Sequence, residues 1–262
     1  IHANHGAGMR SFLLSSLQNT TDEITQHGAC LGLGLTSLGT CDETIYDAVK
    51  DVLYTDSAVA GEAAGIALGM LMVGKSSERT EEMLAYAHDT QHEKIIRGIA
   101  TGLALTAYGL EEGADALVEN MIRDQDPILR YGGMFAIGLA YRGTANNAAL
   151  RKLLHFAVSD VNQDVRRAAV MNLGFVLCAV PEQCPKTVAL LAESYNPHVR
   201  YGAAMAVGIS AAGTGLPEAC DLLESLFADS VDFVRQGALI AMSLVMIQQS
   251  EHRVARFRKQ LE

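Results

Sequence analysis

The sequence predicts an all-α, tightly curved solenoid of about seven two-helix repeats. Three observations favour this fold class: one unit recurs along the chain, one helix of each unit has a face of small residues, and the composition suits closely packed helices. Of the 262 residues, 49% are hydrophobic, only 6% are aromatic and none is Trp. Because strands favour β-branched and aromatic residues, this composition favours helices.

The repeat appears as a column of small residues, each followed by a large apolar residue. The members of the column lie 34 to 36 positions apart, a period typical of stacked helical units. The small residues are Gly34, Gly69, Ala104, Gly138, Gly174, Gly208 and Ser243, and the large ones are Leu35, Met70, Leu105, Leu139, Phe175, Ile209 and Leu244. The chain therefore contains seven copies of one unit.

One helix of each unit has a Gly/Ala face, because small residues recur at positions i and i+4. In the second copy this helix is expected to run from about Val59 to Val73. A glycine inside a helix costs about 1 kcal/mol relative to alanine, so 24 glycines indicate that helix backbones must approach closely. We expect these helices to form the inner, concave wall of a toroid-like array.

The other helix of each unit has the amphipathic spacing of an outer helix. Its apolar positions in three copies are Ala114, Leu117, Val118, Met121 and Ile122; Leu150, Leu153, Leu154, Ala157 and Val158; and Ala219, Leu222, Leu223, Leu226 and Phe227. We expect these residues to pack inside their own repeat. The opposite faces of these helices are then the surface available to partners.

The turns carry the expected helix start and stop signals. A column of mostly good N-cap residues comprises Asp22, Ser57, His92, Asp126, Asn162, Asn196 and Val231, and Pro127 and Pro197 each follow a cap directly. Helix-closing glycines are Gly39, Gly74, Gly109, Gly143 and Gly213. The fifth copy departs from the pattern, with Asn172 in a small column and Ala179 in place of the closing glycine.

Charge and cysteine content exclude several function classes. The net charge of −10 disfavours nucleic acid, which requires clustered Lys and Arg. Five cysteines without a CxxC motif (Cys30, Cys41, Cys178, Cys184 and Cys220) indicate reduced thiols in the cytoplasm or nucleus. No span reaches the ~20 strongly apolar residues of a membrane helix.

We expect a single repeat domain over residues 1–262, cut from a longer array. The chain starts at Ile1, and near its end Val254, Phe257, Arg258 and Leu261 resemble the start of another helix.

One motif resembles a nucleotide-binding loop. The segment Gly69–Ser76 fits the pattern GxxxxGK[ST], and an ATP-binding switch acting through Lys75 is the corresponding hypothesis. The same glycine spacing recurs without Lys-Ser at Gly34 and Gly39, at Gly138 and Gly143, and at Gly208 and Gly213. Because the motif follows the repeat, a helix end is the favoured interpretation.

Other candidate site residues also have structural interpretations. His88 and His92 have the spacing of a zinc-binding pair, but His92 falls in the N-cap column. His27, His155 and His198 lie in or beside repeat helices, and Asp42-Glu43, Glu81-Glu82 and Glu111-Glu112 lie at turns and helix starts. The sequence therefore predicts no catalytic, cofactor-binding or metal-binding residue, and no small-molecule substrate.

A column of arginines opens the Gly-rich helix in the later copies. Arg130, Arg166, Arg200 and Arg235 each follow by six residues Asp124, Asp160, Ser194 and Asp229. This spacing predicts a ladder of Asp–Arg contacts along the stack. A structural role is favoured over a row of ligand-binding arginines.

The units resemble the proteasome/cyclosome repeat family. The resemblance is carried by HGACLGLGLTSLGT (His27 to Thr40) and RYGAAMAVGISAAGTG (Arg200 to Gly215). The segments YTDSAVAGEAAG, QHEKIIRG, SDVNQDVRRAAV and SYNPHVRYGAAM further resemble the larger non-ATPase scaffold subunits of the proteasome regulatory particle. Family toroids have more units than seven, together with N-terminal rod and C-terminal segments, so sites on those parts are not transferred to this chain.

The resemblance implies a non-catalytic scaffold in the base of the regulatory particle. Its implied partners are the ATPase ring, lid subunits and ubiquitin receptors, and its implied process is ubiquitin-dependent protein degradation. The alternative is a free helical-repeat adaptor that binds peptides in its concave groove. A tightly packed Gly/Ala wall offers few side chains for reading a peptide, and this favours the scaffold.

Overall fold

The computed structural model describes residues 6–258 of the chain. Within this range, fifteen α-helices and one short 3₁₀ helix follow one another, and no strand occurs. The predicted all-α repeat fold is therefore confirmed. By its backbone contacts the chain divides into two compact units, Ile1–Ala140 (unit 1) and Tyr141–Glu262 (unit 2). None of the helices within residues 6–258 is long and apolar enough to cross a lipid bilayer.

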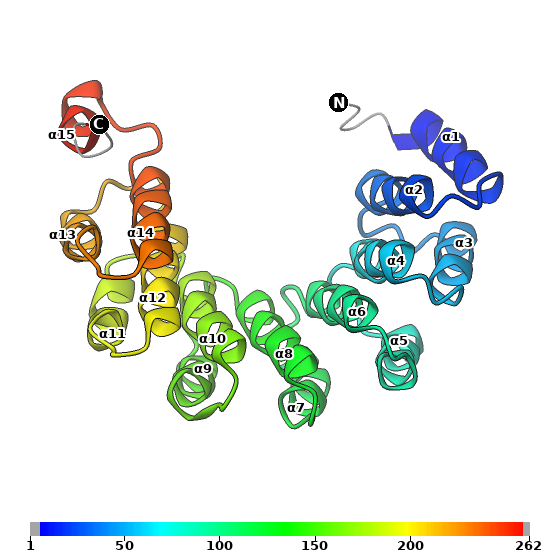
Figure 1. Ribbon diagram of the computed structural model, residues 1–262, viewed down its shortest axis with the longest axis horizontal. Helices are drawn as coiled ribbons and strands as arrows, with labels where there is room; N and C mark the ends of the chain where they lie inside the picture. The colour runs from blue at the N-terminus through cyan, green and yellow to red at the C-terminus, as the bar shows by residue number, and fades with distance from the viewer. Residues whose placement is uncertain (1–5, 259–262) are drawn as a thin grey trace. The chain divides into compact units, whose positions relative to one another are not determined.

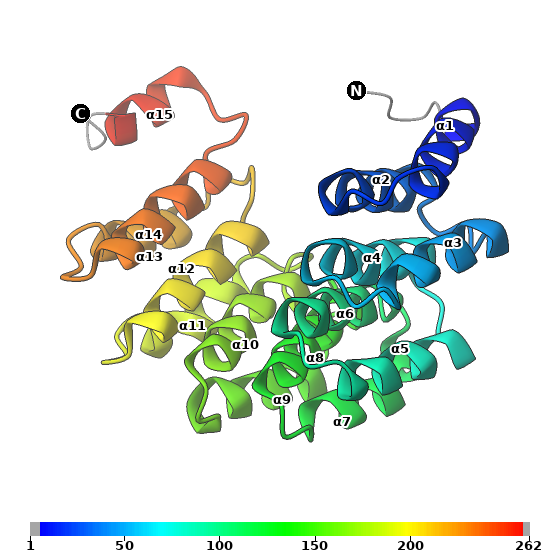
Figure 2. The same cartoon turned by 45° about the vertical axis from the view of Figure 1, so that its right-hand side comes forward.

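Unit 1 contains two rows of helices (Figures 1 and 2). The Gly-rich row is α2 (Glu23–Thr36), α4 (Ala58–Leu71), α6 (Glu93–Thr106) and α8 (Pro127–Ala140). The outer row is α1 (Gly6–Gln18), α3 (Glu43–Leu53), α5 (Glu78–Asp89) and α7 (Asp115–Ile122), with the 3₁₀ helix η1 (Glu111–Ala114) before α7. Each outer helix packs mainly on the Gly-rich helix that follows it in the chain. One repeat is thus an outer helix followed by a Gly-rich helix.

Unit 2 continues the same pattern. Its outer helices are α9 (Asn147–Ser159), α11 (Gln183–Ala192) and α13 (Pro217–Leu226), and its Gly-rich helices are α10 (Gln163–Val176), α12 (Pro197–Ser210) and α14 (Asp232–Val245). A last helix, α15 (Glu251–Arg258), contains Val254 and Phe257, which line an apolar pocket together with residues of α14. Leu261, which the sequence analysis assigned to the same helix, lies outside the described residues.

The predicted caps start the Gly-rich helices. The Asp22 side chain accepts the N–H of Thr25, and the Asn162 side chain accepts those of Asp164 and Val165. His92 and Val231 occupy the same position without a side-chain cap bond. The helices α8 and α12 begin at the two prolines that follow a cap, as expected for a residue that lacks an N–H.

The glycines of neighbouring Gly-rich helices lie against each other's backbone. A Cβ atom added to Gly69 in α4 would lie 2.2 Å from the Cα of Gly102 in α6. In unit 2, a Cβ on Gly174 in α10 would lie 2.5 Å from the carbonyl oxygen of Ala206 in α12. Because no side chain fits in these places, the glycines are what allow the helices to pack this closely.

The two rows are spaced differently within each unit. Neighbouring Gly-rich helices contact each other along their lengths, whereas neighbouring outer helices make few close backbone approaches. A stack that is narrow on one side bends toward that side, which agrees with Gly/Ala-rich helices on an inner wall. The toroid-like closure of the whole array stays a prediction.

The glycine turns join consecutive repeats. Gly39, Gly74, Gly109, Gly143 and Gly213 all have φ between +67° and +73°. Their N–H groups donate to carbonyls at the end of the next Gly-rich helix, those of Met70, Leu105, Leu139, Phe175 and Leu244, at 2.9–3.3 Å. In the fifth copy Ala179 takes the place of the closing glycine, and the bond within the turn is the usual one, from the N–H of Val180 to the carbonyl oxygen of Leu177 (2.9 Å).

Two sequence expectations need correction. The second Gly-rich helix spans Ala58–Leu71 rather than Val59–Val73, because the backbone leaves the helical region at Met72 to reach the turn at Gly74. Val158, assigned to the packed face of its helix, is 70% exposed, whereas Leu153 and Ala157 of the same helix are buried. The packed face of α9 is thus narrower than the spacing suggested.

Candidate functional site

The segment Gly69–Ser76 straddles the end of α4 and the turn after it. Gly69 lies inside the helix, packed on the backbone of α6. In the turn, the N–H of Gly74 donates to Leu105 of the next repeat (3.3 Å), and the N–H of Lys75 donates to the carbonyl three residues before it (3.0 Å). These N–H groups hold the turn and the next repeat, so they do not form a phosphate cradle.

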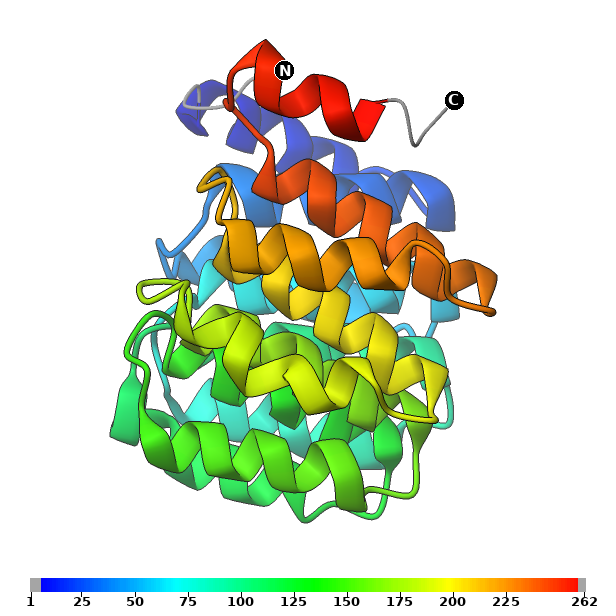
Figure 3. The ribbon, with the colours of Figure 1, turned by 90° about the vertical axis from the view of Figure 1, so that its left-hand side faces the viewer.

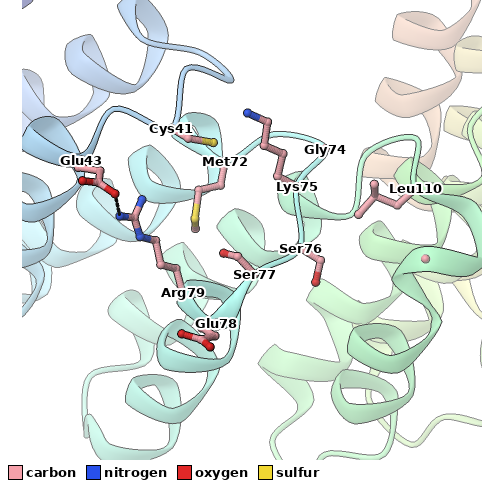
Figure 4. Close-up of a pocket in the computed structure, with 11 residues that line it drawn as sticks. Cys41, Glu43, Met72, Gly74, Lys75, Ser76, Ser77, Glu78, Arg79 and Leu110 are labelled. Carbon is pink, nitrogen blue, oxygen red and sulfur yellow. Dashed lines mark hydrogen bonds and ion pairs between the residues drawn. The ribbon is translucent and has the colours of Figure 1, made fainter.

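A wide pocket of about 750 Å³ opens beside this turn in unit 1. Figure 4 shows that Arg79 faces Glu43 on one side of it, while Lys75 extends away from this pair. The guanidinium of Arg79 lies 3.3 Å from the Glu43 carboxylate and 4.3 Å from the centre of the Tyr46 ring. The arginine therefore has contacts within the protein, whereas Lys75 is exposed to solvent. The arrangement pairs charges between repeats.

The two candidate zinc ligands point to different partners. The Nε2 atom of His88 lies 2.7 Å from a carboxylate oxygen of Asp124, and that of His92 lies 3.5 Å from one of Asp56. Each pair joins one repeat to its neighbour. Within residues 6–258 no group of three or more His, Cys, Asp or Glu side chains is arranged to hold a metal ion.

Three of the other predicted polar residues have structural contacts. His27 Nδ1 lies 2.9 Å from the carbonyl oxygen of Val59, and the His198 ring packs on Phe233 with centroids 5.1 Å apart. The Asp42 carboxylate caps α3 by accepting the N–H of Ile45 (3.2 Å).

All five cysteines are free thiols. Burial raises the pKa of Cys30 to about 12 and that of Cys184 to about 11. At neutral pH both are therefore protonated and poorly reactive, since the thiolate is the reactive form.

Each arginine of the column binds the turn before its own helix, and the predicted Asp–Arg contact between repeats is present at Arg200. Each arginine donates from Nη1 to the carbonyl oxygen of the residue six positions earlier, at 2.6–3.0 Å, in Arg130, Arg166, Arg200 and Arg235 alike. Arg200 also forms a two-bond pair with Asp229 of the next repeat, from Nε (2.6 Å) and Nη2 (2.8 Å). This pair holds the Asp229 pKa below its usual value, mainly through the hydrogen bond from Arg200.

A polar cluster between α3 and α5 was not predicted. Glu82 forms an ion pair with Lys50 and accepts a hydrogen bond from the Tyr54 hydroxyl (3.1 Å). The bond from Lys50 is the main reason why the pKa of Glu82 lies below its usual value. The Tyr54 ring stacks on Tyr86 with centroids 4.8 Å apart. The four-residue spacing of Tyr46, Lys50 and Tyr54 was the available signal, because such residues share a helix face.

Unit 2 exposes large apolar side chains on its outer row. Val158 on α9 and Leu190 on α11 are 70% and 84% exposed, and Val161 and Tyr195 in the turns that follow are 87% and 95% exposed. We call these four residues the outer patch. Val161 and Tyr195 hold the same position in adjacent repeats, directly before a cap, and Figure 3 shows α9 and α11 facing the viewer. Large apolar side chains that a fold leaves exposed on one row of helices are candidates for contact with other proteins.

Two family descriptions match parts of the chain. Residues 28–62 match the proteasome/cyclosome repeat, and residues 148–243 match HEAT repeats. The first match contains the His27 to Thr40 motif apart from its first residue, so the predicted resemblance is confirmed on that motif, whereas the Arg200 to Gly215 motif lies in the HEAT match.

Several proteins are similar along essentially the whole chain. The chain is 70% identical over 265 residues to the 26S proteasome non-ATPase regulatory subunit 1 homolog A of Arabidopsis thaliana, covering 100% of this chain and 26% of the relative. Identity is 57% to the 26S proteasome non-ATPase regulatory subunit 1 of Drosophila melanogaster (96% and 25% covered) and 52% to the 26S proteasome regulatory subunit rpn2 of Schizosaccharomyces pombe (100% and 28% covered). The chain thus spans about a quarter of the length of these relatives. Along its whole length the chain thus resembles one segment of the 26S proteasome non-ATPase regulatory subunit 1, and its residues 28–62 match the proteasome/cyclosome repeat.

Proposed function

We propose that this chain belongs to a non-catalytic scaffold in the base of the proteasome regulatory particle. The observation that carries the proposal is 70% identity, over the whole chain, to a protein named as a 26S proteasome non-ATPase regulatory subunit. The scaffold would organise the ATPase ring, lid subunits and ubiquitin receptors for ubiquitin-dependent protein degradation. We further propose that it acts in the cytoplasm and nucleus.

The way the repeats pack suits a rigid platform. Within each unit, consecutive Gly-rich helices touch backbone to backbone, and the glycine turns add hydrogen bonds to the next repeat. Backbone contacts involve no flexible side chains, so little freedom remains between neighbouring repeats of one unit. A platform of this kind can hold partners at fixed positions without making or breaking a bond.

The outer row is the proposed docking face. The outer patch lies there, while the Gly-rich helices bury most of their small residues against one another. This leaves few side chains on the Gly-rich row that could recognise the sequence of a bound peptide. The observations thus favour a scaffold over a groove-binding adaptor.

The test is an affinity purification of the tagged parent protein from cell extract. Mass spectrometry of the eluate should find proteasomal ATPases and lid subunits in stoichiometric amounts, and the eluate should have ATP-dependent peptidase activity. A protein that elutes alone, or with unrelated peptides, would contradict the proposal and leave the adaptor as the better hypothesis.

A further inference from the structure

Ser194 takes the place that aspartate holds in neighbouring repeats. Asp124, Asp160 and Asp229 each lie two residues before a helix cap, and their Oδ1 atoms accept the N–H of the residue two positions later at 2.7–2.9 Å. The Oγ atom of Ser194 accepts the N–H of Asn196 in the same way, at 3.2 Å. The hydroxyl therefore stands in for one carboxylate oxygen, and the second oxygen is missing.

The second oxygen has a defined role in the next repeat. Asp229 uses both oxygens to bind Arg200, the arginine of the repeat before it. The two side chains are only 8% and 14% exposed, so the pair is largely shielded from water. Two parallel bonds between a guanidinium and a carboxylate are among the stronger side-chain contacts in proteins. This pair fastens two consecutive repeats of unit 2.

Arg166 is placed like Arg200, one repeat earlier, and lacks the corresponding partner. It lies four residues after its helix cap, and its Nη1 donates to the carbonyl oxygen of Asp160 (2.6 Å). Its Nε atom is buried and has no hydrogen-bond partner among the described residues. The residue that holds the Asp229 position for Arg166 is Ser194. A buried donor left without an acceptor destabilises the fold.

We infer that Ser194 is a phosphorylation site and that Arg166 binds the phosphate. A protein kinase would transfer the γ-phosphoryl group of a nucleoside triphosphate to the Ser194 Oγ. The new bond joins Oγ to phosphorus, the bond from the γ-phosphorus to the bridging oxygen breaks, the nucleoside diphosphate leaves with that electron pair, and the hydroxyl proton passes to the kinase's base. Ser194 lies in a surface turn between the exposed residues Glu193 and Tyr195, within reach of such an enzyme.

The phosphate supplies what the serine lacks. It carries a charge of about −2 and three acceptor oxygens, which fit the donor fork of an arginine. Phosphorylation therefore completes the ladder between α10 and the turn before α12, and makes this junction of repeats resemble the Arg200–Asp229 junction. The inference rests on the contacts between repeats and is independent of the scaffold function.

The test compares the full chain with and without phosphoserine incorporated at position 194. Phosphoserine should raise the thermal unfolding midpoint by about 2–4 °C, as expected for one added ion pair in a chain of this size. The increase should vanish in the Arg166→Gln background. Phosphoserine at Ser225, an exposed residue of α13 whose hydroxyl bonds within its own helix, is the matched control and should give no increase.

The fraction of Ser194 that is phosphorylated is measured by mass spectrometry. The protein is isolated, with phosphatases inhibited, from growing and from growth-arrested cells of the organism that makes it. A phosphopeptide containing Ser194 is expected. The inference is overturned if that peptide is absent from both preparations, if phosphoserine at 194 does not raise the midpoint, or if the increase persists without Arg166.

Discussion

Two helical glycines show how the surroundings of a residue decide the effect of adding a methyl group. Gly69 has no room for a Cβ, which would lie 2.2 Å from the Gly102 backbone. We predict that Gly69→Ala lowers the free energy of unfolding by about 2–3 kcal/mol, because α4 and α6 must move apart. Denaturant unfolding followed by circular dichroism measures the change.

Gly28 is the matched control. It lies in α2, is exposed, and a Cβ there would meet nothing within 4 Å. Gly28→Ala should raise the free energy of unfolding by about 0.5–1 kcal/mol, since alanine loses less backbone freedom in a helix. Equal effects at the two positions would show that helix propensity, rather than packing, controls both.

The two aspartates near Arg235 and Arg200 differ in burial, and their ion pairs should differ in strength. Asp229 is 8% exposed and bound twice by Arg200, so Asp229→Ala should cost about 3 kcal/mol, as for other shielded pairs. Asp232, paired with Arg235, is 92% exposed, so Asp232→Ala should change stability by at most about 0.5 kcal/mol. Unfolding of the two variants side by side measures the difference.

The Arg200–Asp229 pair also predicts a pH dependence. The Asp229 pKa is lower in the folded protein than its usual value of 3.8, so the unfolded chain binds the proton more readily. The stabilisation is complete above about pH 5 and is lost as the pH falls through the folded-state pKa. The stability difference between the wild type and Asp229→Asn should therefore be constant from pH 5 to 7 and shrink below pH 4. A difference that grows in acid would contradict the assignment.

Residue by residue, the sequence predicted what depends on neighbours within one helix. The caps at Asp22 and Asn162 and the bond from Arg200 to the Ser194 carbonyl follow from fixed spacings, and the structure contains them. The Lys50–Glu82 pair was missed because it depends on how α3 lies against α5, which spacing within a helix does not reveal. Val158 was misplaced for a related reason: its helix packs with a narrower face than the apolar spacing allows.

At the scale of elements, the turn between repeats is a structural unit with two left-handed positions. The first is the closing glycine, and the position two residues later also has positive φ in four repeats, at Cys41, Glu111, Ala145 and Gly215. Both positions favour glycine, because a side chain there crowds the backbone.

Exchanging glycine and alanine in these turns should change stability in opposite directions. Gly109 has φ +70° with open space around its Cα, so Gly109→Ala should cost about 1 kcal/mol from backbone strain alone. Ala145 has φ +51°, so Ala145→Gly should relieve strain and add about 0.5 kcal/mol. Thermal unfolding of both variants shows whether each change raises or lowers the stability. A loss of stability in Ala145→Gly would contradict the strain argument.

The sequence predicted the closing glycines but not their bonding partners. Positive φ at Gly39 follows from its place after a helix, whereas its bond to Met70 depends on how far one helix is shifted along the next. The fifth turn was recognised as exceptional from Ala179. The bond that it keeps, from Val180 to Leu177, could not be read from that one substitution.

At the scale of the molecule, the outer patch should bind partners without supporting the fold. Val161 and Tyr195 are almost fully exposed, so Val161→Ser with Tyr195→Ser should leave the unfolding midpoint within about 1 °C, as for surface changes in general. Co-purification with other proteasome subunits should fall at least tenfold. The control is Leu38→Ser, an equally conservative change at an exposed apolar residue of unit 1. Equal losses in both variants would exclude a specific role for the patch.

The fold class of the whole molecule was predictable because the same sequence pattern occurs in seven copies. The period of Gly34 and its equivalents gave the number of units, and the small-residue columns gave the row in which backbones touch. Partner surfaces are harder to predict, since the exposure of Tyr195 depends on the packing of two repeats and not on its local pattern.

The bonds that join repeats in these examples connect residues that lie close together in the sequence. His88 to Asp124 spans 36 residues, Arg200 to Asp229 spans 29, and the turn bond from Gly39 to Met70 has a similar reach. Each repeat can therefore complete its contacts as soon as the next has been synthesised, without waiting for a distant part of the chain. Such a protein can fold repeat by repeat while it is still being synthesised. At each stage the Gly/Ala face of the newest repeat is exposed until the next repeat covers it, and this is the surface that a chaperone would need to protect.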